Sequence, residues 1–104
     1  MFTVIYQFNV KEGQSAPFIE SWEKLTILIY QFEGSLGSRL HQVKEHEFLA
    51  YAQWPDCETW QQSGKKLPPK AEAYRAQMKA ACENIQTIHE ASVVRDLLRL
   101  NPHG

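Results

Sequence analysis

Runs of β-branched and aromatic residues predict four strands along the chain. The first is residues 2–9 (FTVIYQFN), in which the even-numbered side chains, Tyr6 among them, share one face and the odd-numbered ones the other. Two more are expected over residues 36–43 (LGSRLHQV) and 47–54 (EFLAYAQW), joined by the short turn KEH as an antiparallel hairpin. The last strand is predicted over residues 85–98.

Apolar residues recurring at spacings of three and four predict a helix over residues 16–31, with Ser15 as its N-cap. The residues in this stripe are Phe18, Ile19, Trp22, Leu25, Ile29 and Phe32. A short helix, CETWQQS, should follow Pro55 with Asp56 as its N-cap, and a longer one is expected over residues 69–84. The stretch GKKLPPK between them favours a helix break over a flexible rim above a pocket.

The predicted order β-α-β-β-α(α)-β is that of the split βαβ, ferredoxin-like α+β fold, with a four-stranded antiparallel sheet and helices on one face. The 104 residues suit one domain over 1–104, ending in a polar tail over 99–104. Apolar residues occur on both faces of the strands, so the second face also needs a cover. A second copy packed sheet against sheet is the simplest one, which predicts a homodimer whose long final strand reaches the partner.

Charge and composition narrow the range of partners. The net charge is -1, with no basic patch, so neither nucleic acid nor a membrane surface is an expected partner. The longest apolar run, residues 25–30, is far too short to span a membrane, and no signal peptide is expected because residue 1 leads straight into a predicted strand. The expected location is the cytoplasm. Cys57 and Cys82, both on predicted helices, are expected to be free thiols.

Most sequence motifs of catalytic or cofactor sites are absent. There is no GxGxxG or P-loop, no HExxH, no CxxC and no GxSxG. In the ferredoxin-like order the second and fourth strands are at opposite edges, so His41 and His89 should not meet within one chain. Neither a metal site nor a cofactor is therefore expected.

Aromatic residues make up 12% of the chain, which suits an apolar pocket for a small, flat aromatic or hydrophobic ligand. Core packing is the competing interpretation. It is favoured for Trp54, which ends a strand, and for Trp22, which has helical spacing with its apolar neighbours, although Trp22 is kept as a candidate ligand contact. Trp60 lies on a short helix beside a break, and it fits a pocket wall and the core equally well.

The segment GSLGSRLHQ…EFLAYAQWPDCETWQQ resembles the antibiotic biosynthesis monooxygenase domain family. The resemblance rests on glycines before the second strand (Gly34, Gly37), a Y-x-x-W pattern ending the third (Tyr51, Trp54) and an aromatic six residues later (Trp60). Together with the element order it covers essentially the whole chain. It implies a dimeric α+β barrel and the oxygenation of aromatic polyketide quinols without metal or flavin, in which the anion of the substrate reacts directly with dioxygen.

On this resemblance, the candidate catalytic residues are His41, Arg39 and Tyr51, and the candidate substrate-binding residues are Trp60, Gln7, Tyr6 and Trp22. Arg39 or His41 would stabilise the anion, and a histidine is suited to act as base near neutral pH. Tyr51 and Gln7 would fix the ring oxygens. The alternative for Arg39 and His41 is a pair of solvated positions on an edge strand.

Haem degradation, known among related proteins, is disfavoured because no histidine lies between Ser63 and Gln86 to bind the iron. Three hypotheses remain: a cofactor-independent oxygenase, a non-catalytic dimer that binds a small ligand, and an isomerase, decarboxylase or dehydratase using His41 or a tyrosine. A pocket with His41 or Arg39 beside Tyr51 would favour an enzyme. One lined only by Trp, Phe and Leu would favour binding.

Overall fold

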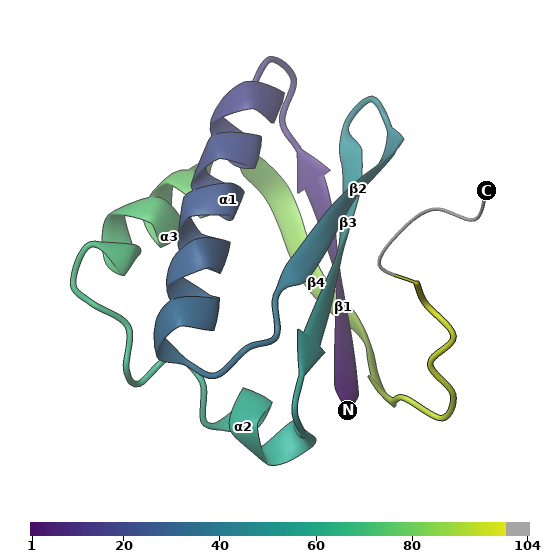
Figure 1. The fold of residues 1–104 in the computed structure, drawn as a ribbon. Helices are drawn as coiled ribbons and strands as arrows, with labels where there is room; N and C mark the ends of the chain where they lie inside the picture. Colours follow the sequence, from purple (N-terminus) through teal and green to yellow (C-terminus); the bar gives the residue numbers. More distant parts are fainter. Residues whose placement is uncertain (100–104) are drawn as a thin grey trace.

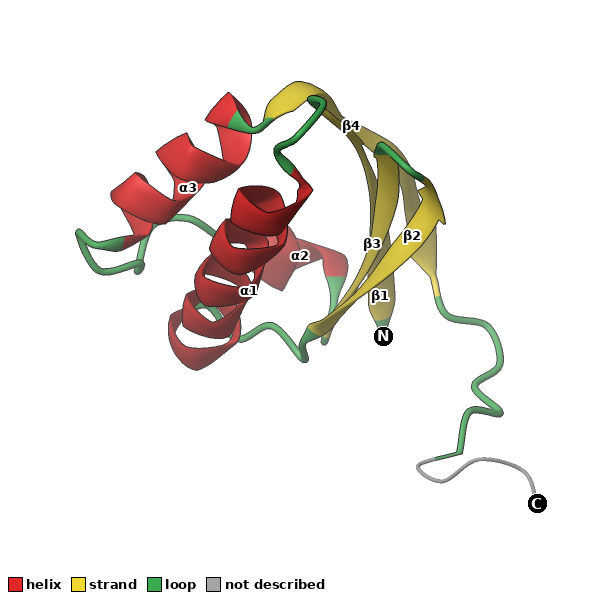
Figure 2. Ribbon diagram, turned by 90° about the horizontal axis from the view of Figure 1, so that it is seen from above, coloured by secondary structure: helices red, strands yellow, loops and turns green. Residues whose placement is uncertain are grey.

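A four-stranded antiparallel sheet with helices against one face forms the protein (Figures 1 and 2). The computed structural model describes residues 1–99, so the predicted tail over 99–104 lies, apart from Arg99, outside the described residues. The elements are β1 (Phe2–Val10), α1 (Ser15–Phe32), β2 (Ser38–Lys44), β3 (Glu47–Trp54), α2 (Cys57–Gln61), α3 (Ala71–Ala80) and β4 (Cys82–Ser92). This arrangement confirms the predicted ferredoxin-like α+β fold.

The strand order is β2-β3-β1-β4, which places β2 and β4 at opposite edges, as predicted. The β1–β3 register is unbroken from Phe2↔Trp54 to Asn9↔Glu47. The β1–β4 register shifts between Ile5, opposite His89, and Tyr6, opposite Thr87. Residue 88 of β4 is therefore an extra residue opposite the middle of β1, which is the pattern of a β-bulge.

The core lies between the sheet and α1. The ring of Phe18 packs at centroid distances of 4.9 Å from Phe8 and 5.1 Å from Phe48. The predicted stripe was wrong for Ile19 and Phe32, which are 43% and 46% exposed. The face that α1 buries consists of Phe18, Ser21, Leu25 and Leu28. Each residue is rotated by about 100° from the one before it, so Ile19 points away from the direction of its buried neighbour Phe18.

Two predicted boundaries near the C-terminus were wrong. The helix predicted over 69–84 ends at Ala80, and the strand begins at Cys82 because this segment pairs with Val10 of β1. Cys82 is therefore on a strand, not on a helix. The strand predicted to reach residue 98 ends at Ser92 because its partner Phe2 is the first residue of β1. Strand pairing overrides local helix propensity here.

Side-chain capping agrees with the prediction at α2 but not at α1. The Asp56 carboxylate accepts a hydrogen bond from the Thr59 N–H at 2.7 Å, so it is the N-cap of α2. Ser15 is already within α1, and the N-cap position, Gln14, makes no side-chain capping bond. Residues 62–70 form a loop that separates α2 from α3, as expected from the GKKLPPK stretch. No helix among residues 1–99 is both long and apolar enough to cross a membrane.

After β4, residues 93–98 run along the sheet on the side opposite the helices (Figures 1 and 2). We call these residues the C-terminal segment. Three of its apolar side chains are largely exposed: Val94, Leu97 and Leu98. One backbone hydrogen bond, from Val93 N–H to Met1 C=O at 2.9 Å, holds its beginning to the sheet.

Candidate functional site

Each face of the sheet has its own cavity. Because successive residues of a strand point to opposite faces, neighbouring residues of one strand face different cavities. The inner cavity lies between the sheet and the helices and has a volume of about 210 Å³. The outer cavity lies between the sheet and the C-terminal segment and has a volume of about 780 Å³. The two cavities offer a ligand different chemistry.

Mostly apolar and aromatic side chains line the inner cavity. The sheet contributes Tyr6, Phe8, Ser38, Ala50, Ala52, Trp54 and Ile85; α1 and the turn after it contribute Trp22, Leu25, Thr26, Ile29 and Ser35; α3 contributes Arg75 and Met78. Two alanines of β3, Ala50 and Ala52, face the helices where larger side chains would fill the space. The small size of these two residues leaves room for a ligand.

Tyr6 supplies a hydroxyl to the inner cavity. Its oxygen accepts a hydrogen bond from Trp60 Nε1 at 3.0 Å, and this bond joins β1 to α2. Burial raises the pKa of Tyr6, although the bond from Trp60 acts in the opposite direction. Tyr6 is therefore a neutral phenol at physiological pH, and no acceptor for its own hydrogen is found within residues 1–99.

Trp54 has a buried hydrogen-bond donor without an acceptor. Its side chain is 3% exposed, and no atom of residues 1–99 accepts a hydrogen bond from its Nε1. Buried polar groups in proteins are nearly always hydrogen-bonded, and an unmade bond costs about 1–3 kcal/mol. Other atoms of Trp54 line the inner cavity, which lies beside this buried N–H.

Of the described residues that line the inner cavity, Arg75 is the one that is charged. Its Nη1 contacts Glu72 Oε1 at 3.2 Å on the helix surface, which leaves other guanidinium N–H groups free to donate. Among residues 1–99, no carboxylate or imidazole lines this cavity. With Tyr6, Trp54 and Arg75, it presents hydrogen-bond donors against apolar walls, an arrangement that suits a flat ligand with an electron-rich or ionised oxygen.

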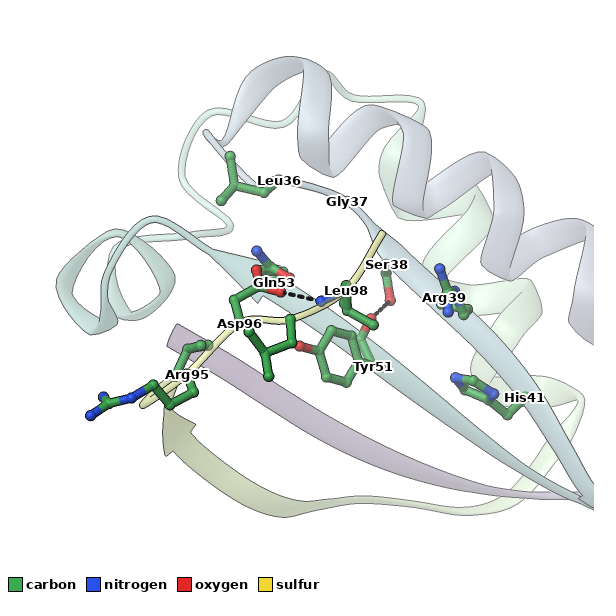
Figure 3. Close-up of a pocket in the computed structure, with 12 residues that line it drawn as sticks. Leu36, Gly37, Ser38, Arg39, His41, Tyr51, Gln53, Arg95, Asp96 and Leu98 are labelled. Carbon is green, nitrogen blue, oxygen red and sulfur yellow. Dashed lines mark hydrogen bonds between the residues drawn. The ribbon is translucent and has the colours of Figure 1, made fainter. Parts of the chain in front are cut away.

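The outer cavity contains all three candidate catalytic residues, Arg39, His41 and Tyr51 (Figure 3). Arg39 and Tyr51 are directly opposite each other on β2 and β3, and His41 follows on the same face of β2. The Tyr51 hydroxyl accepts a hydrogen bond from the Thr3 hydroxyl at 3.4 Å. Arg39 and His41 are exposed, and the C-terminal segment bounds the other side of the cavity.

The structure thus divides the predicted site residues between the two faces of the sheet. Tyr6 and Trp22 line the inner cavity, and Trp60 reaches its edge through the bond to Tyr6. The three catalytic candidates line the outer cavity, and Gln7 is on the outer face by strand alternation but lines neither cavity. Within one chain, the two groups cannot contact the same small ligand.

The sequence did not indicate that Trp54 and Arg75 line the inner cavity. Trp54 is buried, as expected for a core residue, but its unpartnered N–H emerges only from the packing around it. Arg75 is paired with Glu72 on the helix surface, and only the position of α3 brings it to the cavity. The sequence signal for a cavity beside Trp54 was two small residues, Ala50 and Ala52, on the same face of β3 as Trp54. No cluster of three or more His, Cys, Asp or Glu suited to a metal ion occurs within residues 1–99.

Several proteins of known structure have the same fold as this chain. SnoaB, a cofactor-independent oxygenase from Streptomyces nogalater, superimposes with a TM-score of 0.75 at 14% identity, covering 94% of this chain and 97% of SnoaB. A proposed antibiotic biosynthesis monooxygenase from Deinococcus radiodurans gives a TM-score of 0.73 at 10% identity, covering 97% and 100% of the two chains. At such identities the likeness shows the fold alone.

Another proposed monooxygenase of this kind, from Nitrosomonas europaea, gives a TM-score of 0.74 at 12% identity over 91% of this chain and 100% of that one. A search of curated proteins found no significant match. The model of the family described as antibiotic biosynthesis monooxygenase matches residues 1–84, most of the chain. The protein therefore belongs to the antibiotic biosynthesis monooxygenase family.

Proposed function

We propose that this protein is a cofactor-independent monooxygenase that binds a small hydroxylated aromatic or quinol-type substrate in the inner cavity. Family membership supports a monooxygenase, and the cofactor-independent oxygenase SnoaB has the same fold. The observation that carries the choice of cavity is the buried Trp54 N–H, which has no acceptor among the described residues. A ligand oxygen at this point would satisfy it.

The donors of the inner cavity would stabilise the anion of the substrate. Trp54 Nε1–H and the neutral Tyr6 hydroxyl can both donate to a phenolate oxygen, and the positive charge of Arg75 favours the same ionised form. Since none of the described residues lining the cavity has a carboxylate or an imidazole, we infer that the substrate loses its proton to solvent and enters as the anion. The rate should therefore rise with pH until the substrate is fully ionised.

The anion would then react directly with dioxygen. For a ring CH₂ of the anthrone type, both C–H bonds break and a C=O bond forms; one oxygen atom enters the carbonyl and the other leaves as water. All four electrons that reduce the dioxygen come from the substrate. Trp22, Phe8 and Ile29 would hold the ring and keep water from the intermediate.

Dioxygen uptake by chelator-treated protein tests the proposal, with anthrones and naphthohydroquinones as substrates and the autoxidation of each as control. Uptake above autoxidation that falls in Trp54→Phe would support the inner cavity. Uptake that falls in Tyr51→Phe and not in Trp54→Phe would place the reaction in the outer cavity, with the catalytic candidates Arg39 and His41. Absence of uptake with every substrate, from folded protein, would contradict an oxygenase of this substrate class.

The two alternatives have less support. A non-catalytic binding protein fits the apolar walls but does not account for Arg75 among them. It would be favoured by tight binding of naphthols without uptake. An isomerase or decarboxylase needs an acid or base, and among the described residues that line the inner cavity only Tyr6 could serve, with a pKa that burial raises.

We also propose that the outer face of the sheet binds a second copy of this chain. Its apolar side chains and those of the C-terminal segment are incompletely covered: Leu97 is 86% exposed and Leu98 71%. In a two-fold dimer, the apolar segment of each copy can cover the sheet face of the other copy. Arg39, His41 and Tyr51 would then lie between the copies.

The free thiols Cys57 and Cys82 agree with the reducing cytoplasm, which we propose as the location.

Sedimentation equilibrium tests the dimer. We expect the mass of a dimer for the wild type and a shift toward monomer when Leu97 and Leu98 are both replaced by serine, because the interface would lose apolar area. The matched control replaces Ile19 and Phe32 with serine, because both are exposed on α1 away from the outer face; this variant should sediment as the wild type does. A wild-type protein that sediments as a monomer at all concentrations would overturn this proposal.

A further inference from the structure

Glu33, directly after α1, has a buried side chain that binds a distant part of the backbone. The residue is 7% exposed, and none of the ion pairs found within residues 1–99 involves it. Its Oε1 accepts a hydrogen bond from Lys66 N–H at 2.9 Å, and its Oε2 accepts one from Gly64 N–H. Both carboxylate oxygens therefore hold the loop between α2 and α3.

The loop is shaped to receive this carboxylate. Gly64 has φ +98°, a conformation that favours glycine, and it turns the N–H groups of residues 64 and 66 toward the same point. Converging backbone N–H groups of this kind form a site for an anion. Here the anion is part of the chain, and we call this arrangement the Glu33 clamp.

The Glu33 clamp lies between two helices that bring residues to the inner cavity. The loop joins α2, which carries Trp60, to α3, which carries Arg75. With five residues, α2 is too short to be stable alone, so its position depends on what holds its ends. Asp56 caps its beginning, and the Glu33 clamp holds the chain three residues after its end.

The turn after α1 touches α2 directly as well. A Cβ added to Gly34 would lie 3.3 Å from Thr59 Cγ2, so α2 packs closely against this turn, and a larger residue at position 34 would require Thr59 to shift. The next residue, Ser35, lines the inner cavity. The turn after α1 therefore lines the inner cavity through Ser35 and also contacts α2, the helix that carries Trp60.

We propose that Glu33 is a positioning residue that sets the place of Trp60, and through it of the Tyr6 hydroxyl, at the inner cavity. What the cavity binds rests on the function proposed above, but the Glu33 clamp itself can be tested without any substrate. In Glu33→Gln, one acceptor oxygen becomes an NH₂ group facing a backbone N–H. One of the two bonds is lost, and the end of α2 should loosen.

The test uses ¹⁵N-labelled protein and compares Glu33→Gln with Glu58→Gln, which removes the same charge from an exposed residue of α2. We expect the amides of Gly64 and Lys66 to exchange with solvent roughly 10- to 100-fold faster in Glu33→Gln, as loss of one charge-assisted hydrogen bond implies. The indole N–H resonance of Trp60 should shift or broaden while that of Trp22 stays in place. Glu58→Gln should leave both resonances and the exchange rates as in the wild type.

Unchanged exchange of Gly64 and Lys66 in Glu33→Gln would show that the carboxylate does not hold the loop. Faster exchange with an unmoved Trp60 resonance would show that the Glu33 clamp only fastens the loop; either result overturns the proposal. If Glu33→Gln does not fold, Gly64→Ala disturbs the same loop with Glu33 intact, and the same Trp60 criterion applies. Neither readout depends on dioxygen uptake, so the proposed function can fail while this inference stands.

Discussion

Replacing Trp54 and Trp60 with phenylalanine, one at a time, should affect stability differently. Both substitutions remove an indole N–H and a similar amount of ring. In Trp54→Phe the lost N–H has no acceptor within residues 1–99, whereas in Trp60→Phe it is the donor to Tyr6 at 3.0 Å. The pair therefore separates the hydrogen-bond contribution from the loss of packing.

The magnitudes follow from the burial of each ring. Truncating a buried tryptophan to phenylalanine removes about 40 Å² of apolar surface, or about 1 kcal/mol of the free energy of unfolding. In Trp54→Phe, release of an unsatisfied donor gains about 1–3 kcal/mol against this loss, so we expect a stability between that of the wild type and about 2 kcal/mol above it. Trp60 is only half-buried, so Trp60→Phe loses less apolar contact, but the broken bond adds about 0.5–1.5 kcal/mol to that loss and nothing offsets it; this variant should be the less stable one.

Ligand affinity should show the reverse order. The probe is 1-naphthol, titrated by calorimetry at a pH where part of it is ionised. Loss of a hydrogen bond to a charged oxygen corresponds to roughly 10- to 100-fold weaker binding in Trp54→Phe. Trp60→Phe should bind more tightly than Trp54→Phe, because the Trp54 donor remains.

Urea unfolding followed by circular dichroism gives the stabilities, provided that the m-values of the variants agree with the wild type. The reasoning would be refuted if Trp54→Phe lost about 3 kcal/mol or more and bound 1-naphthol as the wild type does. That result would mean that the Trp54 N–H has an acceptor within the folded protein and that Trp54 is only a core residue.

Three further predictions concern the inner cavity and the two thiols. Ala50→Leu should fill the inner cavity and weaken 1-naphthol binding at least about tenfold while the protein stays folded; unchanged affinity would place the ligand elsewhere. The free energy of unfolding should fall as the pH rises from about 9 toward 11, because burial raises the pKa of Cys82 from 9.0 to about 11 and also raises that of Tyr6, so the folded state holds both protons more tightly. Cys82→Ala should reduce this slope, and an identical slope would show that Cys82 does not contribute. At pH 8 a thiol reagent should label Cys57, which is partly exposed, before the buried Cys82, and equal rates would contradict the packing of β4.

Most of the fold could be predicted because its elements differ clearly in hydrophobic period. The boundary between α3 and β4 could not, since residues 81–84 have a local pattern that suits a helix and are extended only because β1 lies beside them. The end of β4 depends likewise on where β1 begins. Such boundaries are decided by pairing over a long sequence distance, which a local pattern does not record.

The candidate site could be predicted only in part, because a strand with apolar residues at both parities does not reveal which face it buries. In β3, Leu49 and Tyr51 compete with Phe48 and Ala50 for the core, and the register with β1 decides the outcome. Tyr6 and Trp22 both line the inner cavity, and Trp60 donates a hydrogen bond to Tyr6. Tyr51 and its neighbours on β2 face away from them by this parity, which the residue types alone could not settle.

The unbroken register between β1 and β3 has a consequence for how this protein can change over evolutionary time. Neighbouring residues of β3 serve opposite faces, so a substitution at position 50 or 52 can reshape the inner cavity without touching the outer face, and one at position 51 can do the reverse. An inserted or deleted residue has no such freedom, because it would turn Tyr51 into the core and Ala50 out of it. Relatives that diverge in ligand and in assembly should therefore differ along β3 in residue type but not in strand length.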